Sequence, residues 1–215
     1  MSAEAIMEAS REPLDAGRVL ATSPHSAPLD SSGGGMFEGR PSFSLANRIF
    51  RVLWSLSWFL LARWTPPPLH AWRRFVLRLF GARIGPGARI YSSSRIWLPA
   101  NLTIGKNAWL GPRTNCYNQG AISIGARAVI SQGAHLCASS HDVSDPMFQL
   151  VTRPIIIGDE AWVAAEAFVG PGVTVGAGAV LGARGVAMRD LDPWVIYSGN
   201  PAQPLKRRIV RDERA

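Results

Sequence analysis

The sequence contains little cysteine and no long apolar run, and each shortage excludes a class of protein. Its 215 residues include only two cysteines, Cys116 and Cys137, whose number and spacing suit neither a disulfide-rich secreted scaffold nor a metal site. The most apolar stretch is uncharged only between Arg51 and Arg63, well short of the roughly 20 residues of a membrane-spanning helix. We therefore expect a protein of a reducing compartment that holds no metal ion and does not cross a bilayer.

Acidic residues are missing from a long central part of the chain. No Asp or Glu occurs between Glu38 and Asp142, whereas Lys and Arg occur throughout that span, and the chain carries a formal net charge of +8. A surface of this sign suits an anionic partner such as a phosphate, a nucleic acid or an acidic lipid leaflet. Charge alone does not choose among these partners.

The first 40 residues lack the features of a folded segment. They show no hydrophobic periodicity and end in the sequence DSSGGG, so residues 1–40 are predicted to form a disordered tail. Glu4, Glu8 and Glu12 lie where a signal peptide would be basic and then apolar, so no signal peptide is predicted. The expected location is the cytoplasm.

Residues 41–82 are predicted to form an amphipathic helical segment. Hydrophobic spacing indicates one helix over 45–64 and a second over 69–80, which are separated by the sequence TPPPLH and stopped at Gly81. Polar or small residues share one side of the first helix: Asn47, Arg48, Arg51, Ser55 and Ala62. Tryptophan and arginine on such helices are typical of proteins on a membrane interface, but the apolar faces equally suit packing on the main domain or on a neighbouring subunit.

The rest of the chain follows a six-residue rhythm. Aliphatic or similarly small apolar residues recur at this interval: Ile84, Ile90, Ile96, then Ile104, Leu110, Cys116, then Ile124, Ile130, Leu136, then Ile157, Val163, Val169, then Val175, Leu181 and Ala187. A mostly small residue follows four places after each of them. Two coupled positions that repeat together are the signature of a repeat architecture.

A six-residue unit corresponds to one short strand and one tight corner, so three units close a three-sided coil. Stacked coils bury the aliphatic column and pair each strand with the coils above and below. The pattern resembles the hexapeptide repeat of the left-handed parallel β-helix, and it predicts an all-β domain over residues 83–200 with an excursion at 142–156. The two helices precede this domain, and a short C-terminal helix or tail is expected in residues 201–215.

Ordered motifs extend this resemblance to one family. The sequences NLTIG, ISQGAHLCASSHD, AWVAAEAFVGPG and SGNPA, together with the helical segment, resemble the colanic acid biosynthesis acetyltransferases over about residues 41–208. That family is a branch of the galactoside and maltose O-acetyltransferase group. The resemblance implies acetyl transfer from acetyl-CoA to a sugar hydroxyl in a homotrimer, with active sites between neighbouring prisms.

His141 holds the position of the catalytic histidine of that group, after the last regular hexapeptide before the excursion. A sugar hydroxyl is a weak nucleophile, so a base with a pKa near 7 is needed, and imidazole at about 6.5 meets that need. Asp142 or Asp145 could orient the ring. A hydrogen-bonded turn histidine is the structural alternative.

The other histidine of the predicted prism, His135, lies one six-residue unit earlier and therefore on another face. A zinc site of the carbonic-anhydrase type needs three converging histidines, so these two imidazoles do not predict one.

The resemblance also implies residues for both substrates. The CoA contacts expected from it are Trp162, Ala165, Ala183, Arg189, Asn200 and Lys206. The sugar-facing candidates are Asn115, Tyr117 and Asn118, although a solvated turn explains them almost as well. Gly111 and Gln119 stand where galactoside acetyltransferases present an amide and a carboxylate, so a galactoside acceptor is not expected.

Three functions therefore remain open at the level of sequence. The first is an O-acetyltransferase that modifies a free or lipid-linked sugar of an exopolysaccharide repeat unit, with His141 as general base, in the cytoplasm and near an anionic membrane surface. The second keeps the mechanism but uses a soluble sugar, a nucleotide-sugar or an antibiotic as acceptor. The third is a scaffold without catalysis. None of the three implies a nucleic-acid partner.

Overall fold

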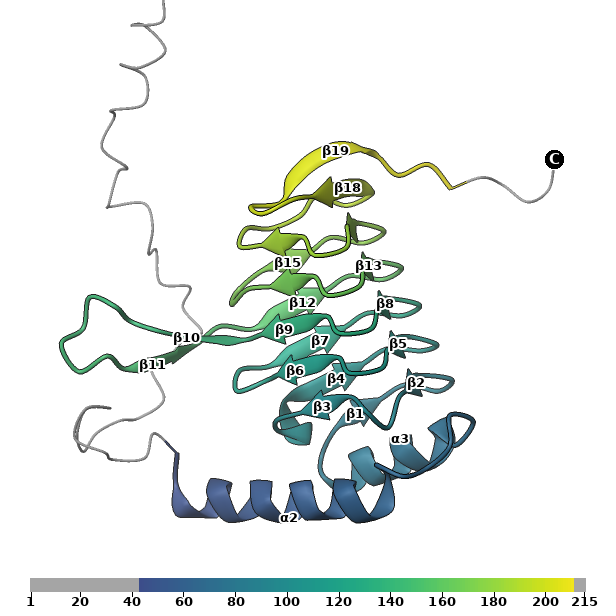
Figure 1. The fold of residues 1–215 in the computed structure, drawn as a ribbon, viewed down its shortest axis with the longest axis vertical. Helices are drawn as coiled ribbons and strands as arrows, with labels where there is room; N and C mark the ends of the chain where they lie inside the picture. The colour runs from purple at the N-terminus through teal and green to yellow at the C-terminus, as the bar shows by residue number, and fades with distance from the viewer. Residues whose placement is uncertain (1–42, 211–215) are drawn as a thin grey trace, which may run out of the picture.

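The computed structural model describes residues 43–210, in which two helices are followed by stacked coils of short strands (Figure 1). The helices are α2 (Leu45–Leu61) and α3 (His70–Leu79). The predicted tail at 1–40 lies outside the described residues.

Most strands contain only two or three residues, as a six-residue unit requires. They are β1 (Arg83–Ile84), β2 (Arg89–Ile90), β3 (Arg95–Ile96), β4 (Leu102–Ile104), β5 (Trp109–Leu110), β6 (Asn115–Tyr117), β7 (Ile122–Ile124), β8 (Val129–Ile130), β9 (His135–Cys137), β10 (Ser139–His141), β11 (Leu150–Thr152), β12 (Ile155–Ile157), β13 (Trp162–Val163), β14 (Phe168–Val169), β15 (Thr174–Val175), β16 (Val180–Leu181), β17 (Val186–Ala187), β18 (Val195–Ser198) and β19 (Gln203–Arg207). A short 3-10 helix, η4 (Pro99–Asn101), precedes β4.

Successive strands of each coil belong to three different sheets. The β1 sheet has the order β1-β4-β7-β12-β15, the β2 sheet runs β2-β5-β8-β13-β16-β18-β19, and the β3 sheet runs β3-β6-β9-β14-β17. Pairing between coils is parallel, and Trp162 pairs with Val180, three hexapeptides later. The predicted β-solenoid is confirmed.

The hexapeptide aliphatics fill the interior of this prism. Ile90, Leu110 and Ile130 of the β2 sheet are fully buried, and so are the small corner residues Ala108 and Ala128. A larger side chain at a corner would collide with the next coil, because adjacent coils are already in close contact there. The two coupled periodicities of the sequence therefore correspond to one interior column and one corner.

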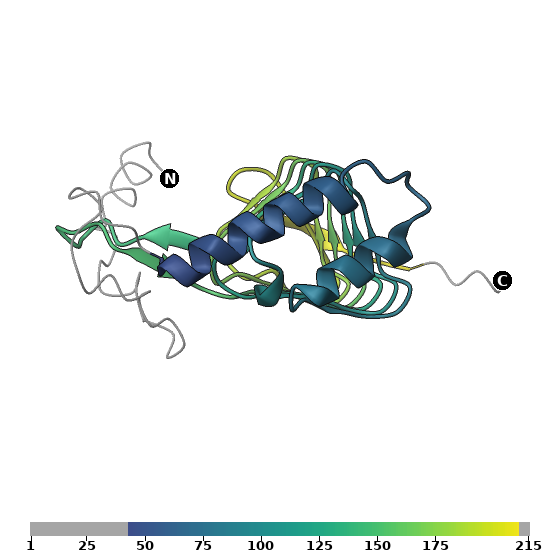
Figure 2. The ribbon, with the colours of Figure 1, turned by 90° about the horizontal axis from the view of Figure 1, so that it is seen from below.

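The two predicted helices are confirmed, and they cover the N-terminal end of the coil stack (Figure 2). The indole Nε1 of Trp54 donates a hydrogen bond to the Ile96 carbonyl (2.7 Å), and that of Trp58 donates to the Ser92 carbonyl (3.2 Å). Gly81 ends the second helical segment with φ +88°, a left-handed conformation that favours glycine. Within the described part of the chain, neither helix has the length and apolarity needed to span a membrane.

The predicted C-terminal helix is wrong for the described residues up to 210. The chain reverses after Ser198, and β19 pairs antiparallel with β18, with Ser198 opposite Gln203. The exposed edge of the last coil offers unpaired backbone groups, which a returning strand satisfies. Pro204 lies within this segment and has no N–H for a helical hydrogen bond.

A hairpin occupies the interruption in the six-residue rhythm. Strands β10 and β11 pair antiparallel, with His141 opposite Leu150, and they carry the chain away from the prism (Figure 1). The chain then returns through β12, which resumes parallel pairing with β7. His141 thus lies where the regular solenoid ends and the excursion begins.

Candidate active site

The ring of His141 is held by the backbone of the excursion. Its Nδ1 atom lies 2.9 Å from the carbonyl oxygen of Phe148, and the two rings stack with centroids 4.6 Å apart and planes 7° apart. A carbonyl oxygen only accepts hydrogen bonds, so Nδ1 of the neutral ring carries the proton. The Nε2 atom is then the unprotonated nitrogen, which is the form that a general base needs.

Two aspartates shape the loop that presents the Phe148 carbonyl. The Asp145 carboxylate accepts a hydrogen bond from the Met147 N–H (2.9 Å), and the Asp145 carbonyl accepts one from the Phe148 N–H (2.8 Å). The Asp142 carboxylate accepts from the Ser144 N–H (2.9 Å). The oxygen at the imidazole Nδ1 is therefore a backbone carbonyl, and the aspartates act on the loop that carries it. No side-chain pattern in a sequence marks such a carbonyl.

His135 belongs to a separate cluster on the outer side of the β3 sheet. The Asn115 amide Nδ2 donates to His135 Nε2 (3.2 Å), in keeping with their pairing across β6 and β9. Phe168 and Tyr117 meet the imidazole edge-on, at centroid distances of 5.3 Å and 6.4 Å. Burial lowers the pKa of His135, so the neutral ring is favoured. The sugar-facing candidates Asn115 and Tyr117 thus lie beside His135.

The third sugar-facing candidate, Asn118, is fully buried. Its Oδ1 accepts hydrogen bonds from the N–H groups of Trp97 (3.0 Å) and Leu98 (3.1 Å), and its Nδ2 donates to the Leu98 carbonyl. These contacts fix a corner between two coils. The neighbouring Gln119 donates through Nε2 to the Tyr117 hydroxyl (2.9 Å), which positions that phenol.

Trp162 lies on the outer face of the β2 sheet. Its Nε1 donates to the Ser131 hydroxyl (2.8 Å), so one edge of the indole is fixed while the ring stays substantially exposed. It borders an open cavity of about 370 Å³ with Arg127 and Arg208. The Arg208 guanidinium donates to the Glu160 carbonyl (2.8 Å), which holds the rim of the cavity.

The other CoA candidates lie on the last coils. Ala165 and Ala183 occupy corners of successive coils, because the Arg184 N–H beside Ala183 donates to the Ala165 carbonyl (2.9 Å). Arg189, Asn200 and Lys206 are exposed. The small corner side chains and the exposed cations are compatible with a long, phosphorylated ligand that runs along the prism.

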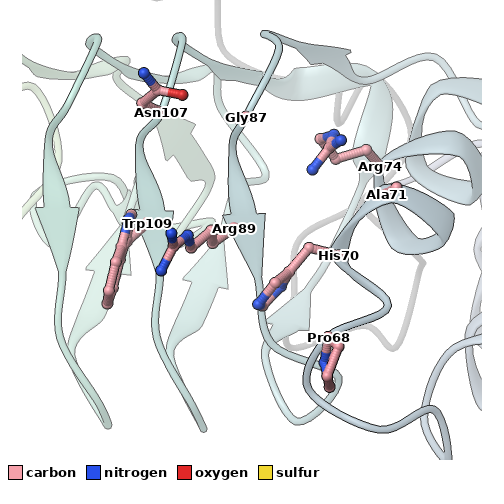
Figure 3. Close-up of a pocket in the computed structure, with 8 residues that line it drawn as sticks. All are labelled: Pro68, His70, Ala71, Arg74, Gly87, Arg89, Asn107 and Trp109. Carbon is pink, nitrogen blue, oxygen red and sulfur yellow. The ribbon is translucent and has the colours of Figure 1, made fainter.

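A cationic cavity that sequence reasoning missed lies lower on the β2 sheet. Its volume is about 420 Å³, and Figure 3 shows Arg89 and Trp109 facing it from neighbouring strands, with His70 and Arg74 facing it from α3. The Arg89 guanidinium lies 4.6 Å from the centroid of the Trp109 indole. Burial, opposed by a hydrogen bond to the Ile90 carbonyl, lowers the pKa of His70.

The cavity walls come from the part of the chain without acidic residues, and neither ion pair found among residues 43–210 involves Arg74 or Arg89. Such a cavity suits a ligand with negative charge. The long stretch without acidic residues predicted a cationic surface, but it spans too many positions to identify the four side chains that meet at this cavity.

One chain does not bring all the candidates together. The hairpin with His141 leaves the prism on one side, whereas β5, β8 and β13 of the β2 sheet lie on the other side (Figure 1). Trp162 and the cationic cavity share the β2 sheet. His141 therefore has the geometry of a base, but its own chain does not place Trp162 beside it.

Comparison with known proteins identifies close relatives. No family model matches the chain. It is 42% identical over 167 residues to a protein of Escherichia coli strain K12 named "Putative colanic acid biosynthesis acetyltransferase WcaF", and the match covers 78% of this chain and 92% of that protein. The protein of the same name from Shigella flexneri matches equally well.

Solved structures share the fold at lower identity. A maltose O-acetyltransferase from Clostridium difficile 630 superposes with a TM-score of 0.70 at 21% identity, over 78% of this chain and 90% of that chain. A hexapeptide-repeat acetyltransferase from Vibrio cholerae, in complex with acetyl-CoA, gives 0.71 at 18% identity, over 79% and 93%. The coil stack and the N-terminal helices thus belong to a shared architecture.

Proposed function

This chain belongs to the hexapeptide-repeat acetyltransferase family that includes WcaF, and we propose that it acetylates a sugar hydroxyl of an exopolysaccharide repeat unit, using acetyl-CoA as donor and His141 as general base. The observation that carries the proposal is the contact between His141 Nδ1 and the Phe148 carbonyl. This contact directs the basic Nε2 atom away from the loop backbone. The site of action would be the cytoplasm, where acetyl-CoA is available.

The chemistry requires one proton to move twice. His141 Nε2 takes the proton of the sugar hydroxyl while the oxygen attacks the thioester carbonyl carbon. When the C–S bond breaks, the imidazolium returns the proton to the departing thiolate, so the ring ends neutral. During the step the Phe148 carbonyl accepts from the Nδ1–H of a charged ring, and charge strengthens such a hydrogen bond. Base assistance of this kind contributes typically ~10²–10⁴-fold.

We assign the donor to the upper coils of the β2 sheet and to the corner beside it. The exposed indole of Trp162 offers an apolar surface for the pantetheine arm, and the small side chains of Ala165 and Ala183 let the chain of the donor approach the backbone. Arg189 and Lys206 would meet the phosphates, and Asn200 lies in the turn between β18 and β19. Cations there form charge-assisted hydrogen bonds with phosphate.

The separation of His141 from Trp162 within one chain supports a site shared between chains. A neighbouring prism, placed with its β2 sheet against the hairpin, would bring its Trp162 to this His141. A closed ring of such contacts needs the same two surfaces on every copy, which is the property of a cyclic oligomer. We propose a homotrimer, the cyclic assembly that the resemblance to the galactoside and maltose O-acetyltransferase group implies.

The cationic cavity supports an acceptor with negative charge. It lies below Trp162 on the same sheet, and Arg89 and Arg74 carry its charge. An acidic sugar, or a sugar linked to lipid through phosphate, would fit this charge better than a neutral free sugar. Soluble sugars, nucleotide-sugars and antibiotics are the competing acceptors, and a scaffold without catalysis is the competing function.

Mass spectrometry of acceptors tests the proposal directly. The protein is incubated with acetyl-CoA and, in separate reactions, with lipid-linked repeat units, free acidic oligosaccharides, neutral oligosaccharides and chloramphenicol. We expect a mass gain of one acetyl group on the acidic or lipid-linked glycans, and none with His141→Ala. Turnover of chloramphenicol or of neutral sugars alone would overturn the acceptor assignment, and no acetylation of any acceptor would favour the scaffold.

A further inference from the structure

Helix α2 buries Trp54, Trp58 and the C-cap residue Ala62 against the prism, but its outer side is also apolar, whereas an ordinary surface helix keeps its outer side polar. Its outward side carries large apolar side chains that are each more than half exposed: Ile49, Val52, Leu53, Leu56, Phe59 and Leu60. The polar side chains of Asn47 and Arg51 are turned toward the prism instead. Burial of Trp54 and Trp58 on the inward side explains how the helix is attached, but it does not explain the apolar residues outside.

The inward polar groups make this orientation costly. The Arg51 guanidinium lies 4.3 Å from the centroid of the Trp97 indole, and its Nε atom is buried without a hydrogen-bond partner among the described residues. The Asn47 Oδ1 atom is likewise buried without a hydrogen-bond partner among the described residues. A buried polar atom without a partner is unfavourable. The sequence thus tolerates polar groups inside while leaving an apolar surface outside, which indicates that something covers that surface.

Helix α3 extends the same surface. Its exposed side carries Trp72, Phe75 and Leu79, and Trp72 Nε1 donates to the Leu61 carbonyl (2.7 Å), which ties the helix to the end of α2. Both helices lie across the lower end of the prism, as Figures 1 and 2 show from two directions. We call the outward side of α2 and α3 the end face. Apolar patches of this extent mark interaction surfaces.

The exposed charges that the two helices and the segment between them carry are all positive. Arg48 lies on its exposed side in the first turn of α2, and exposed Arg63 follows the last turn, beside Trp64. No acidic residue occurs anywhere between Glu38 and Asp142. Basic side chains, tryptophan and an apolar helix face are the combination with which proteins bind an anionic lipid interface.

We propose that the end face lies on the surface of an anionic lipid bilayer, with both helices in the headgroup plane and the prism standing away from it. A second copy of this chain is the less favourable occupant, because pairing the end face with itself would bring Arg48 and Arg63 against cations of the same kind. Leu56 and Phe59 enter the acyl boundary, and Arg48 and Arg63 meet lipid phosphates. This binding does not depend on acetyl transfer, but it would present the cationic cavity to lipid-linked acceptors.

Vesicle flotation of the full chain, without acetyl-CoA, tests the proposal. One set of vesicles contains phosphatidylcholine alone, and the other contains phosphatidylcholine with phosphatidylglycerol. We expect at least tenfold more bound protein on the anionic vesicles, and a severalfold loss at high salt, because screening shortens the reach of the arginine charges. Leu56→Glu with Leu60→Glu should abolish binding. The control is Ile209→Glu, which changes a still more exposed aliphatic residue in the segment that follows β19, away from both helices.

Each outcome decides between occupants. Binding that is lost in the Leu56/Leu60 variant and kept in Ile209→Glu supports the bilayer. Absence of wild-type binding to anionic vesicles overturns it. The end face is instead an interface between copies if the wild type does not bind vesicles and the Leu56/Leu60 substitutions halve the molecular mass of the oligomer in solution. Thermal unfolding checks that the variant folds, and acetylation of a soluble acceptor tests the catalytic proposal separately.

Discussion

The imidazole of His141 lies flat on the ring of Phe148 while its Nδ1 atom contacts the carbonyl oxygen of the same residue. One residue, seven positions further along the chain, therefore fixes both the plane and the tautomer of the histidine. The hairpin closes this short loop through the β10 and β11 pairing. The excursion is thus part of the candidate catalytic unit and not only a cover over it.

Replacement of His141 tests its role as base. His141→Ala should reduce kcat by ~10²–10⁴-fold, because the variant lacks the proposed general base. The side chain is partly exposed at the start of the excursion, so the unfolding temperature should hardly change. Thiol release from acetyl-CoA with the correct acceptor measures the first effect, and thermal denaturation measures the second. Full activity in this variant would remove His141 from the mechanism.

Phe148→Ala should weaken catalysis without weakening donor binding. The substitution removes the stacked ring but keeps the backbone carbonyl, so the imidazole retains its tautomer and loses the surface that fixes its plane. We expect kcat to fall by up to about 10²-fold, the loss that a misplacement of about 1 Å can cause, while the KM for acetyl-CoA stays the same. Met147→Ala is the matched control, because it truncates the adjacent, partly exposed side chain at the same tip. Equal losses in both variants would mean that the loop as a whole was disturbed.

The stability of the protein should depend on pH through His135. Burial lowers the pKa of His135 below its ordinary value of 6.5, so the unfolded chain binds more protons than the folded chain in that range. Folding stability is then complete above this value and falls as the pH drops toward the lowered pKa. His70, whose pKa is lowered mainly by burial, acts in the same direction.

His135→Gln should therefore flatten the loss of stability between neutral and mildly acidic pH. Denaturant midpoints measured across that range provide the comparison, with His70→Gln as the parallel variant and the double variant as the flattest case. A wild-type slope that persists unchanged in both single variants and in the double variant would show that other groups control the acid response.

The solenoid could be predicted from the sequence because each hexapeptide carries its own signal. Ile90, Leu110 and Ile130 are equivalent in sequence and equivalent in space, so one rule assigns all of them. The hairpin of β18 and β19 could not be predicted in this way. Its pairing depends on an open edge of the last coil, which exists only after the solenoid has folded.

In the candidate site, the sequence could point to residues whose side-chain type suggests a chemical role, but not to features that depend on how the chain folds. His141 could be selected as a candidate because it follows the last regular hexapeptide before the large interruption, where the family that the sequence resembles has its catalytic histidine. The Phe148 carbonyl and the cavity around Arg89 depend on three-dimensional placement, and the sequence gives no spacing for either. The orientation of α2 was also hidden, because Asn47 and Arg51 of the expected polar side face the prism, whereas Arg48 and Ser55 of that side are exposed.

A mixing experiment tests whether the active site is shared between chains. His141→Ala chains lack the proposed base, and Trp162→Ala chains lack the proposed donor surface, so each variant alone should be weak when acetyl-CoA is scarce. In a cyclic trimer that contains both variants, one contact in three joins an intact His141 from one chain to an intact Trp162 from the next, so about a third of the contacts are intact. Co-expression with two different tags, followed by purification on both, isolates the mixed oligomers.

Recovery toward about a third of wild-type activity would require that His141 and Trp162 act across a chain boundary. A site contained within one chain predicts a different result, because every chain in the mixture would still carry one damaged component. Its activity would then equal the average of the two variants, whatever the degree of mixing. A control mixture of His141→Ala with Phe148→Ala, both on the same hairpin, should give no comparable recovery, because the two substitutions damage the same side of each contact.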